Sequence, residues 1–156
     1  MKVDHLMNSA VQTCGPEDNL AEVVSILWHS DYGAVPVVDE ENTLLGIITD
    51  RDICMALSTN PRLASDVKVK EVMSKEVHSC HADDNIHSAM ELMMRHRVRR
   101  LPVIDEDGKL EGLLAMSDLI LSAGPVGKKR TPRVTCADVV ETLQGICRPH
   151  ASPKSK

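Results

Sequence analysis

Apolar residues recur along this chain with helical spacing in some stretches and in short unbroken runs in others. Between residues 20 and 27 they mark one helical face, and the preceding Pro16, two acids and Asn19 are typical helix-start residues. The valine-rich run at 34–38 is typical of a buried strand. For this half of the chain the pattern predicts an opening strand near 11–14, a helix from 20, strands at 34–38 and 44–49 joined by an acidic turn, and a short helix at 50–57.

The same pattern returns 66 residues later without a gap. Pro36 matches Pro102 and Gly46 matches Gly112, and twelve of the 47 positions from 7 to 53 are identical to their partners. Two copies of one supersecondary unit predict a mixed α/β (α+β) domain of two β-α-β-β-α repeats related by a pseudo-twofold axis. In the second copy we expect an opening strand near 77–80, a helix with Ile86, Ala89, Met90 and Met93 on one face, a strand at 110–115 and a short helix at 117–122.

The repeats are expected at 3–58 and 67–123, followed by a basic tail at 124–156. The tail holds one more amphipathic helix near 137–147, which must pack on the domain or on a second subunit. It carries seven Lys/Arg and two acids, whereas residues 1–123 carry eleven and twenty-one. The acidic body argues against nucleic-acid binding. The tail can dock on an acidic partner surface or remain a solvated, partly mobile segment.

The composition excludes several other classes. One Trp, one Tyr and no Phe cannot build an aromatic platform for stacking bases. Five cysteines without a Cys-x-x-Cys pair fit a reducing compartment better than a disulfide framework. The chain has neither an apolar run of membrane-spanning length nor a signal-peptide pattern at its start, so we expect a cytoplasmic protein without membrane contact.

A polar motif follows each hairpin where its second strand enters a helix. In the first copy it runs from Gly46 through Thr49 to Asp52. Helix N-termini favour phosphate, a carboxylate can accept hydrogen bonds from both ribose hydroxyls, and a threonine hydroxyl can reach either group. The alternative is that Thr49 and Asp52 only cap their helix.

The two motifs, each preceded by a Pro-Val-Val/Ile-Asp segment, closely resemble the CBS domain over residues 3–123, in the tandem arrangement called a Bateman module. The resemblance implies two clefts, each mixing both repeats, that bind AMP, ADP, ATP, or sometimes NAD or S-adenosylmethionine. These molecules act as regulatory ligands and are not obligatory cofactors. It further implies a homodimer, an effect on a partner protein, and no catalytic activity.

Carried over by position, the resemblance assigns a primary and a secondary cleft. Ala115 stands where the primary motif has Thr49, which removes a hydroxyl and weakens the secondary site by one hydrogen bond, about 0.5–1.5 kcal/mol. In the secondary cleft Tyr32 can stack on adenine or simply pack. The primary set is Thr49, Arg51, Asp52, Ser79, Cys80, Val98, Arg99 and Arg100, and the secondary set is Thr13, Cys14, Tyr32, Gly33, Ala34, Met116, Ser117 and Asp118.

Three alternatives stand beside this hypothesis, and the residues argue against the first two. His78, Cys80 and His81, with His87 further on, are metal-ligand types, but no fourth ligand is evident nearby and we expect no metal site. No nucleophile elbow or phosphate-binding Gly-x4-Gly-Lys-Ser/Thr loop occurs, so no enzyme class is indicated. A structural module for oligomerisation, with vestigial clefts, is the second candidate function.

Overall fold

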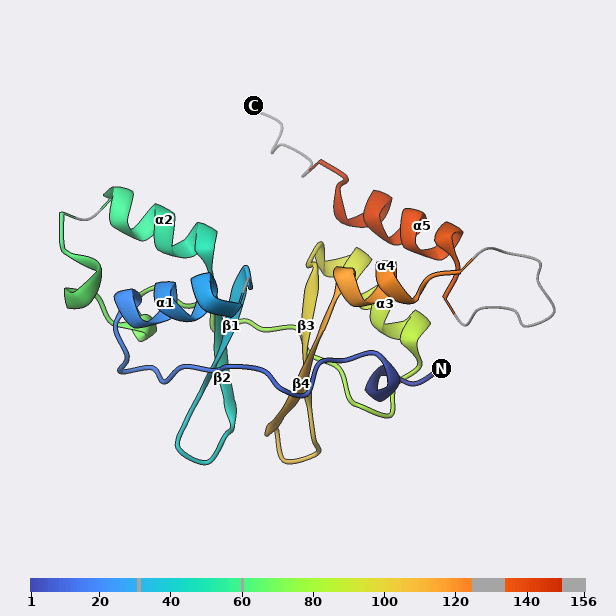
Figure 1. The fold of residues 1–156 in the computed structure, drawn as a ribbon, viewed down its shortest axis with the longest axis horizontal. Helices are drawn as coiled ribbons and strands as arrows, with labels where there is room; N and C mark the ends of the chain where they lie inside the picture. The colour runs from blue at the N-terminus through green and yellow to red at the C-terminus, as the bar shows by residue number, and fades with distance from the viewer. Residues whose placement is uncertain (31, 60, 125–133, 150–156) are drawn as a thin grey trace, which may run out of the picture.

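The computed structural model describes residues 1–30, 32–59, 61–124 and 134–149. Two antiparallel β-hairpins lie side by side at its centre, with the helices of each repeat on opposite outer sides (Figure 1). The first repeat holds α1 (Leu20–Ser30), β1 (Ala34–Val38), β2 (Leu44–Thr49) and α2 (Asp50–Thr59). The second holds α3 (Ile86–His96), β3 (Arg100–Ile104), β4 (Leu110–Ala115) and α4 (Met116–Ser122), and α5 (Cys136–Ile146) follows.

The mixed α/β (α+β) class and the two-repeat architecture are confirmed, with the predicted strands at 34–38, 44–49 and 110–115. Each hairpin contributes buried residues to the core of its own repeat. Leu20, Val35 and Ile48 are completely buried in the first, and Ile86, Leu101 and Leu114 in the second. No helix among the described residues is long and apolar enough to cross a membrane.

The predicted opening strands are wrong. Each is reduced to one residue, Cys14 or Cys80, which forms a single parallel bridge to β1 or β3. The pairing ends there because the chain turns at once. Asp18 accepts a hydrogen bond from the backbone N–H of Gly15 at 2.7 Å, and Asp84 does the same for His81 at 2.8 Å. The described part of each repeat therefore has a two-stranded hairpin and no third strand.

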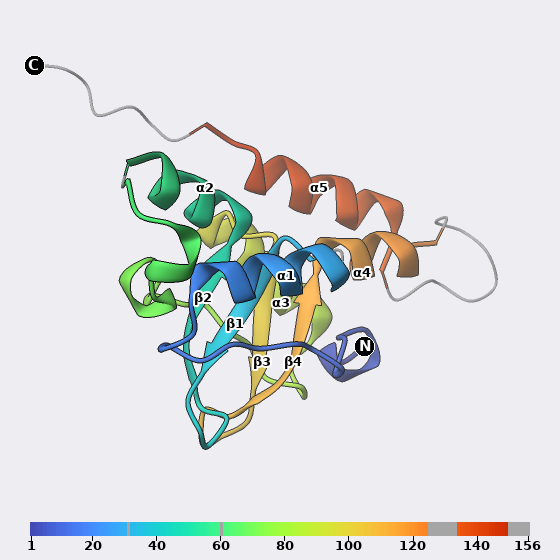
Figure 2. The ribbon, with the colours of Figure 1, turned by 60° about the vertical axis from the view of Figure 1, so that its left-hand side comes forward.

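The segment that leads into each repeat packs on the other repeat. Val3 is completely buried in the core of the second repeat, and its N–H donates to Asp84 O at 3.0 Å. Val69, its counterpart 66 residues later, is completely buried in the core of the first repeat, and its N–H donates to Asp18 O at 2.9 Å. Figures 1 and 2 show the dark-blue N-terminal segment running across the hairpins to the second repeat. Each core is thus completed by a valine from the segment that leads into the other repeat.

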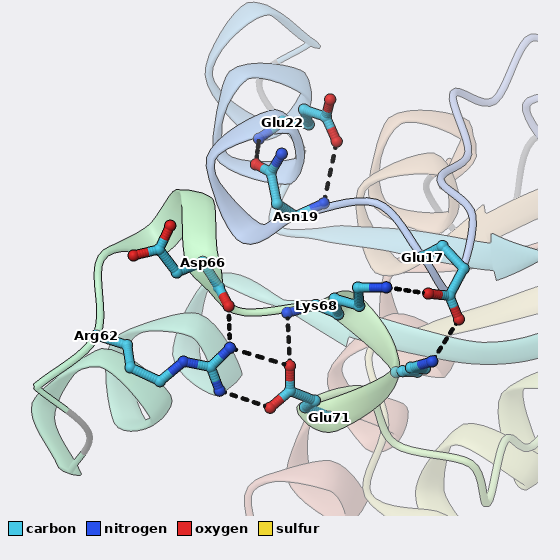
Figure 3. A network of polar contacts seen from close by, with 8 residues as sticks. Glu17, Asn19, Glu22, Arg62, Asp66, Lys68 and Glu71 are labelled. Atoms are coloured by element: carbon cyan, nitrogen blue, oxygen red, sulfur yellow. Dashed lines mark hydrogen bonds and ion pairs between the residues drawn. The ribbon is translucent and has the colours of Figure 1, made fainter.

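Ion pairs join each leading segment to the repeat on which it packs. Figure 3 shows Lys68 bound to Glu17 of the first repeat, and Glu71 bound to Arg62 at 2.7 Å. Lys2 and Asp83, which occupy the positions of Lys68 and Glu17 in the other copy, also form an ion pair. The exchange therefore repeats one lysine–acid pair as well as the buried valine, whereas the Arg62–Glu71 pair has no counterpart in the other copy.

The motif glycines permit this close approach. A Cβ on Gly46 would lie 2.8 Å from Ser74 O, and a Cβ on Gly112 would lie 2.9 Å from Asn8 O. Both distances are shorter than side-chain carbons tolerate, so only glycine fits where the leading segment crosses β2 or β4. Ser74 and Asn8 form antiparallel bridges there with Ile47 and Leu113, respectively.

Helix α5 lies within the predicted basic tail and packs on the second repeat beside α3 and α4 (Figure 1). Its Val139 and Ile146 are buried in that repeat's core, and Leu143 packs against the core. Of the two choices left by the sequence, α5 therefore packs on its own domain. The remaining tail residues at 125–133 and 150–156 lie outside the described residues.

Candidate functional site

A cleft of about 450 Å³ lies where the two repeats meet. The first repeat contributes the start of β1 and the junction of β2 with α2. The second contributes the segment before Ser79 and the connection between α3 and β3. Ile146, at the end of α5, also reaches the lining. A ligand in this cleft would therefore contact both repeats and the C-terminal helix.

Seven residues expected at a nucleotide site line this cleft. They include the pair Gly33 and Ala34, which the resemblance assigns to the secondary cleft but which lie here beside primary-cleft residues. Sequence reasoning missed other lining residues, among them Asp50, Glu76 and His78, because it could not place the segment at 76–78 against the first repeat. The seven are Gly33, Ala34, Thr49, Arg51, Val98, Arg99 and Arg100.

Three residues of the expected primary set do not line the cleft. Cys80 is only 4% exposed, its side chain belongs to the core, and burial raises the pKa of its thiol to about 12. Ser79 is half-buried beside it, and Asp52 borders a different hollow on α2. The Cys80 side chain therefore faces the core of the second repeat and not the cleft.

Thr49 and Asp52 cap helix α2. Asp52 Oδ2 accepts hydrogen bonds from the backbone N–H of Thr49 at 2.9 Å and from its hydroxyl at 2.7 Å. The Thr49 hydroxyl in turn accepts from the N–H of Asp52 at 3.2 Å. The capping alternative therefore describes a real contact. It leaves Asp52 Oδ1 without a hydrogen-bond donor among the described residues.

The same cap occurs at the start of α5, where neither of its two residues lines the cleft. Thr135 and Asp138 repeat the Thr-x-x-Asp spacing, with the hydroxyl donating to Asp138 Oδ2 at 2.7 Å and accepting from the Asp138 N–H at 3.1 Å. This spacing therefore forms a helix cap independently of any ligand. The site must be argued from the cleft around Thr49, and the motif alone does not suffice.

Positive charge is in excess in the cleft. Its lining holds four arginines, at 51, 97, 99 and 100, and two carboxylates, Asp50 and Glu76. Asp105, on the turn after β3, accepts hydrogen bonds from the backbone N–H groups of Asp107 and Lys109. No ion pair within the described residues joins Arg99 or Arg100 to the acids at 105–107. The surplus charge suits an anion.

Arg100 crosses between the repeats. A Cβ on Gly33 would lie 3.0 Å from Arg100 Nη2, so a larger residue at position 33 would displace the guanidinium from the first repeat. Arg100 is also close enough to Asp118 for its charge to act on that carboxyl. Burial raises the pKa of Asp118. The hydrogen bond that the Ala115 N–H donates to Oδ2 at 2.7 Å and the positive charge of Arg100 both act to lower this pKa, but burial has the larger effect.

The rest of the secondary set is dispersed. Met116 and Cys14 are buried, at 5% and 4% exposed. Tyr32 accepts a hydrogen bond from the Asn8 side chain at 2.8 Å and lines an apolar pocket on the first repeat. Thr13 is half-buried and Ser117 exposed. The secondary cleft stays a prediction.

The histidines considered as metal ligands point to different partners. His78 stacks on His96 with ring centroids 3.5 Å apart, His81 contacts Ile104 O at 2.9 Å, and His87 lies 3.6 Å from Asp138. No three His, Cys, Asp or Glu side chains within the described ranges are grouped so that they could hold a metal ion.

Comparison with known proteins matches the family described as CBS domain at residues 3–59 and 69–123. CBS domain-containing protein YhcV of Bacillus subtilis is 35% identical over 120 residues, which cover 77% of this chain and 84% of that protein. Inosine-5'-monophosphate dehydrogenase of Methanocaldococcus jannaschii is 34% identical over 119 residues, which cover 76% of this chain but only 23% of the enzyme.

Solved structures agree. The CBS domain pair of protein MJ0100, in complex with 5'-methylthioadenosine and S-adenosyl-L-methionine, superposes with a TM-score of 0.71 at 25% identity, covering 78% of this chain and 94% of that one. CBSX2 in complex with AMP gives 0.68 at 25% identity, covering 77% and 93%. Both repeats, their order and their motif positions are thus accounted for, and the chain belongs to the CBS domain family as a tandem pair.

Proposed function

We propose that this chain is a regulatory module that binds AMP, ADP or ATP between its repeats and passes the ligand state to a partner protein. The carrying observation is the inter-repeat cleft, whose volume of about 450 Å³ lies within the range of small-molecule sites. A ligand that touches both repeats can favour one relative arrangement over another. The relatives that bind AMP or S-adenosylmethionine support an adenosine ligand.

The surplus of arginines favours a phosphorylated ligand. Arg99 and Arg100 approach from the second repeat and Arg51 from the first, so a phosphate between them would receive charge-assisted hydrogen bonds from both repeats. S-adenosylmethionine carries one carboxylate beside a positive sulfonium and a positive ammonium group, so it gains less from such a lining than a phosphorylated nucleotide does. NAD carries phosphates but is larger, and it ranks behind the mononucleotides.

The ribose is assigned to Asp52 by resemblance, and Asp50 is its structural rival. Asp52 uses Oδ2 for the helix cap, which leaves Oδ1 for a ribose hydroxyl, whereas Asp50 lines the cleft directly. Comparing Asp52→Asn with Asp50→Asn separates them. We expect the larger loss of AMP affinity for Asp52→Asn, and a larger loss for Asp50→Asn would reassign the ribose contact.

Calorimetry with two matched ligands tests the site. AMP and 5'-methylthioadenosine share the adenosine but only AMP carries phosphate. Loss of one charge-assisted contact, about 1.5–3 kcal/mol, predicts that Arg99→Ala or Arg100→Ala weakens AMP binding by roughly ten- to a hundredfold and leaves 5'-methylthioadenosine nearly unchanged. Arg95→Ala, four residues before Arg99 but outside the cleft lining, is the control. Equal loss for both ligands would show that the arginines do not bind phosphate.

A structural module with vestigial clefts is the second candidate. It is favoured by the structural roles found for Gly46, Thr49 and Asp52, and by Ala115 in the second motif. This alternative predicts that no adenine nucleotide at millimolar concentration raises the melting temperature, whereas the nucleotide sensor must be stabilised by its ligand.

Transmission to a partner has a structural route. Asp50 lines the inter-repeat cleft and also a second pocket, lined by Trp28 and Tyr32. A ligand that moves the β2–α2 junction therefore changes a surface open to a protein. We propose no catalytic step for this module, and the dehydrogenase match is confined to 23% of that enzyme.

A further inference from the structure

Helix α5 adds one wall to the inter-repeat cleft from outside the two CBS repeats. The family match ends at residue 123, whereas α5 spans Cys136–Ile146. Ile146, its last residue, lines the cleft, and every other described lining residue lies between positions 33 and 102. Ile146 is 8% exposed, so most of its side chain is packed in the core of the second repeat. The cleft therefore contains a contact that the paired repeats alone do not supply.

The position of Ile146 depends on the docking of the whole helix. Val139 and Leu143 lie on the same helical face as Ile146, at the i, i+4, i+7 spacing, and all three pack in or against the core of the second repeat. The helix also approaches α3 closely, because a Cβ on Gly145 would lie 2.6 Å from Met94 Cγ. Ile146 therefore reaches the cleft only while α5 is docked on α3.

The cleft is apolar where Ile146 borders it. Val98, another lining residue, packs against the same buried cluster as Ile146, so both aliphatic side chains lie where the cleft meets the core of the second repeat. Neither side chain can form a hydrogen bond or balance the charge of a phosphate. The face of a purine base carries no charge and gains from contact with this surface, because apolar area on both sides is removed from water.

We propose that Ile146 contacts the adenosine part of the bound nucleotide and thereby couples nucleotide binding to the docking of α5. The inference rests on the function proposed above and extends it to a helix outside the repeats. A ligand that touches Ile146 binds the docked state more tightly than the undocked state. By linkage, the factor by which undocking weakens AMP binding equals the factor by which AMP favours docking. AMP therefore holds α5 on α3, and undocking of α5 promotes the release of AMP.

Two matched alanine variants test the contact by calorimetry with AMP and 5'-methylthioadenosine. Ile146→Ala should weaken the binding of both ligands by the same factor, roughly two- to tenfold, because an aliphatic contact with adenosine does not involve the phosphate. Val139→Ala is the control and should bind both ligands like the wild type, since Val139 is 7% exposed in the same core cluster but does not line the cleft. Equal weakening in the two variants would attribute the effect to lost core packing and overturn the proposed contact, as would a loss confined to AMP.

Two matched leucine variants test the coupling. Gly145→Leu places a side chain against Met94 and should displace α5, so both ligands should bind more weakly although Gly145 lies outside the cleft lining. Leucine is a good helix former, so the helix itself is kept. Val140→Leu, at an outward position of α5 where the valine is 52% exposed, should bind both ligands like the wild type.

Hydrogen exchange, measured by mass spectrometry on the full chain, reports docking directly. Saturation with AMP should slow amide exchange at residues 136–146 of the wild type, and Gly145→Leu should speed it. Unchanged exchange of α5 at saturating AMP overturns the coupling, as does normal binding by a Gly145→Leu variant whose α5 exchanges faster. A wild type that binds neither ligand refutes the proposed function itself, whereas a wild type that binds both, with Ile146→Ala unaffected, overturns only the role of Ile146.

Discussion

Three helix-capping positions, two of them occupied by threonine and one by alanine, allow the capping and binding roles of the motif to be separated. Thr49 caps α2 inside the cleft lining, Thr135 caps α5 with nearly identical hydrogen bonds, and Ala115 begins α4 without a hydroxyl. Thr49→Ala and Thr135→Ala therefore make the same local change in two places. Only the first is expected to affect nucleotide binding.

The size of each effect follows from the hydrogen bonds that the hydroxyl makes. Either substitution removes one hydrogen bond donated by the hydroxyl at 2.7 Å and one accepted by it, and leaves the backbone bond to the aspartate. Loss of a threonine cap costs about 1 kcal/mol, roughly a fivefold change in the unfolding equilibrium. Ala115→Thr should gain a similar amount. Thr49→Ala should also weaken AMP binding by roughly two- to tenfold, because one hydrogen bond to the ligand is removed.

Urea unfolding and calorimetry on the same samples measure both quantities. Equal weakening of AMP binding by Thr135→Ala would refute the reasoning, because the effect would then act through stability alone. A Thr49→Ala variant as stable as the wild type would refute the capping role. A stabilised Ala115→Thr would confirm that the missing hydroxyl is what weakens the cap of α4.

Three further outcomes are expected. Val3→Ala and Val69→Ala should each destabilise by about 2 kcal/mol in one shared urea transition, since each valine completes the other repeat's core; two separate transitions would contradict this. Iodoacetamide at pH 8 should label the three exposed cysteines and spare Cys14 and Cys80, because burial raises the pKa of both thiols to about 12; peptide mass spectrometry measures this. Hydrogen bonds from Lys68 and Lys70 lower the pKa of Glu17 to about 2, so the stability they give is present above about pH 4.3 and fades as pH falls towards 2; an NMR titration midpoint near 4.3, the usual glutamate value, would contradict this.

Local pattern was enough to predict the hairpins and helices. The run at 34–38 and the strand at 44–49 were located from apolar residues and turns alone, and the structure has the same bounds. The opening strands failed because Cys14 and Cys80 are buried by tertiary contact and the chain turns immediately afterwards. An apolar residue before a turn looks the same in sequence whether one residue or four are paired.

The exchange of leading segments could not be predicted from spacing. A repeat offset says that Val3 and Val69 are equivalent, but it does not say on which hairpin either one lies. The identical Lys-Val pairs at 2–3 and 68–69 were the available signal. The cleft could be predicted only in part, because spacing did not reveal the crossing. The motifs identified Thr49 and Arg99, whereas Glu76 and His78 reach the cleft only because the segment after Val69 crosses to the first repeat.

This crossing bears on how the pair arose and on what a single copy would do. A chain with one repeat would present a leading segment with no groove of its own and a groove with no segment. Two such chains would satisfy each other through the same valine, lysine and glycine contacts that join the halves here. The module therefore has the construction of two such chains joined into one polypeptide. Because they are joined, its two halves can differ, as Thr49 and Ala115 do, which two copies of one chain could not.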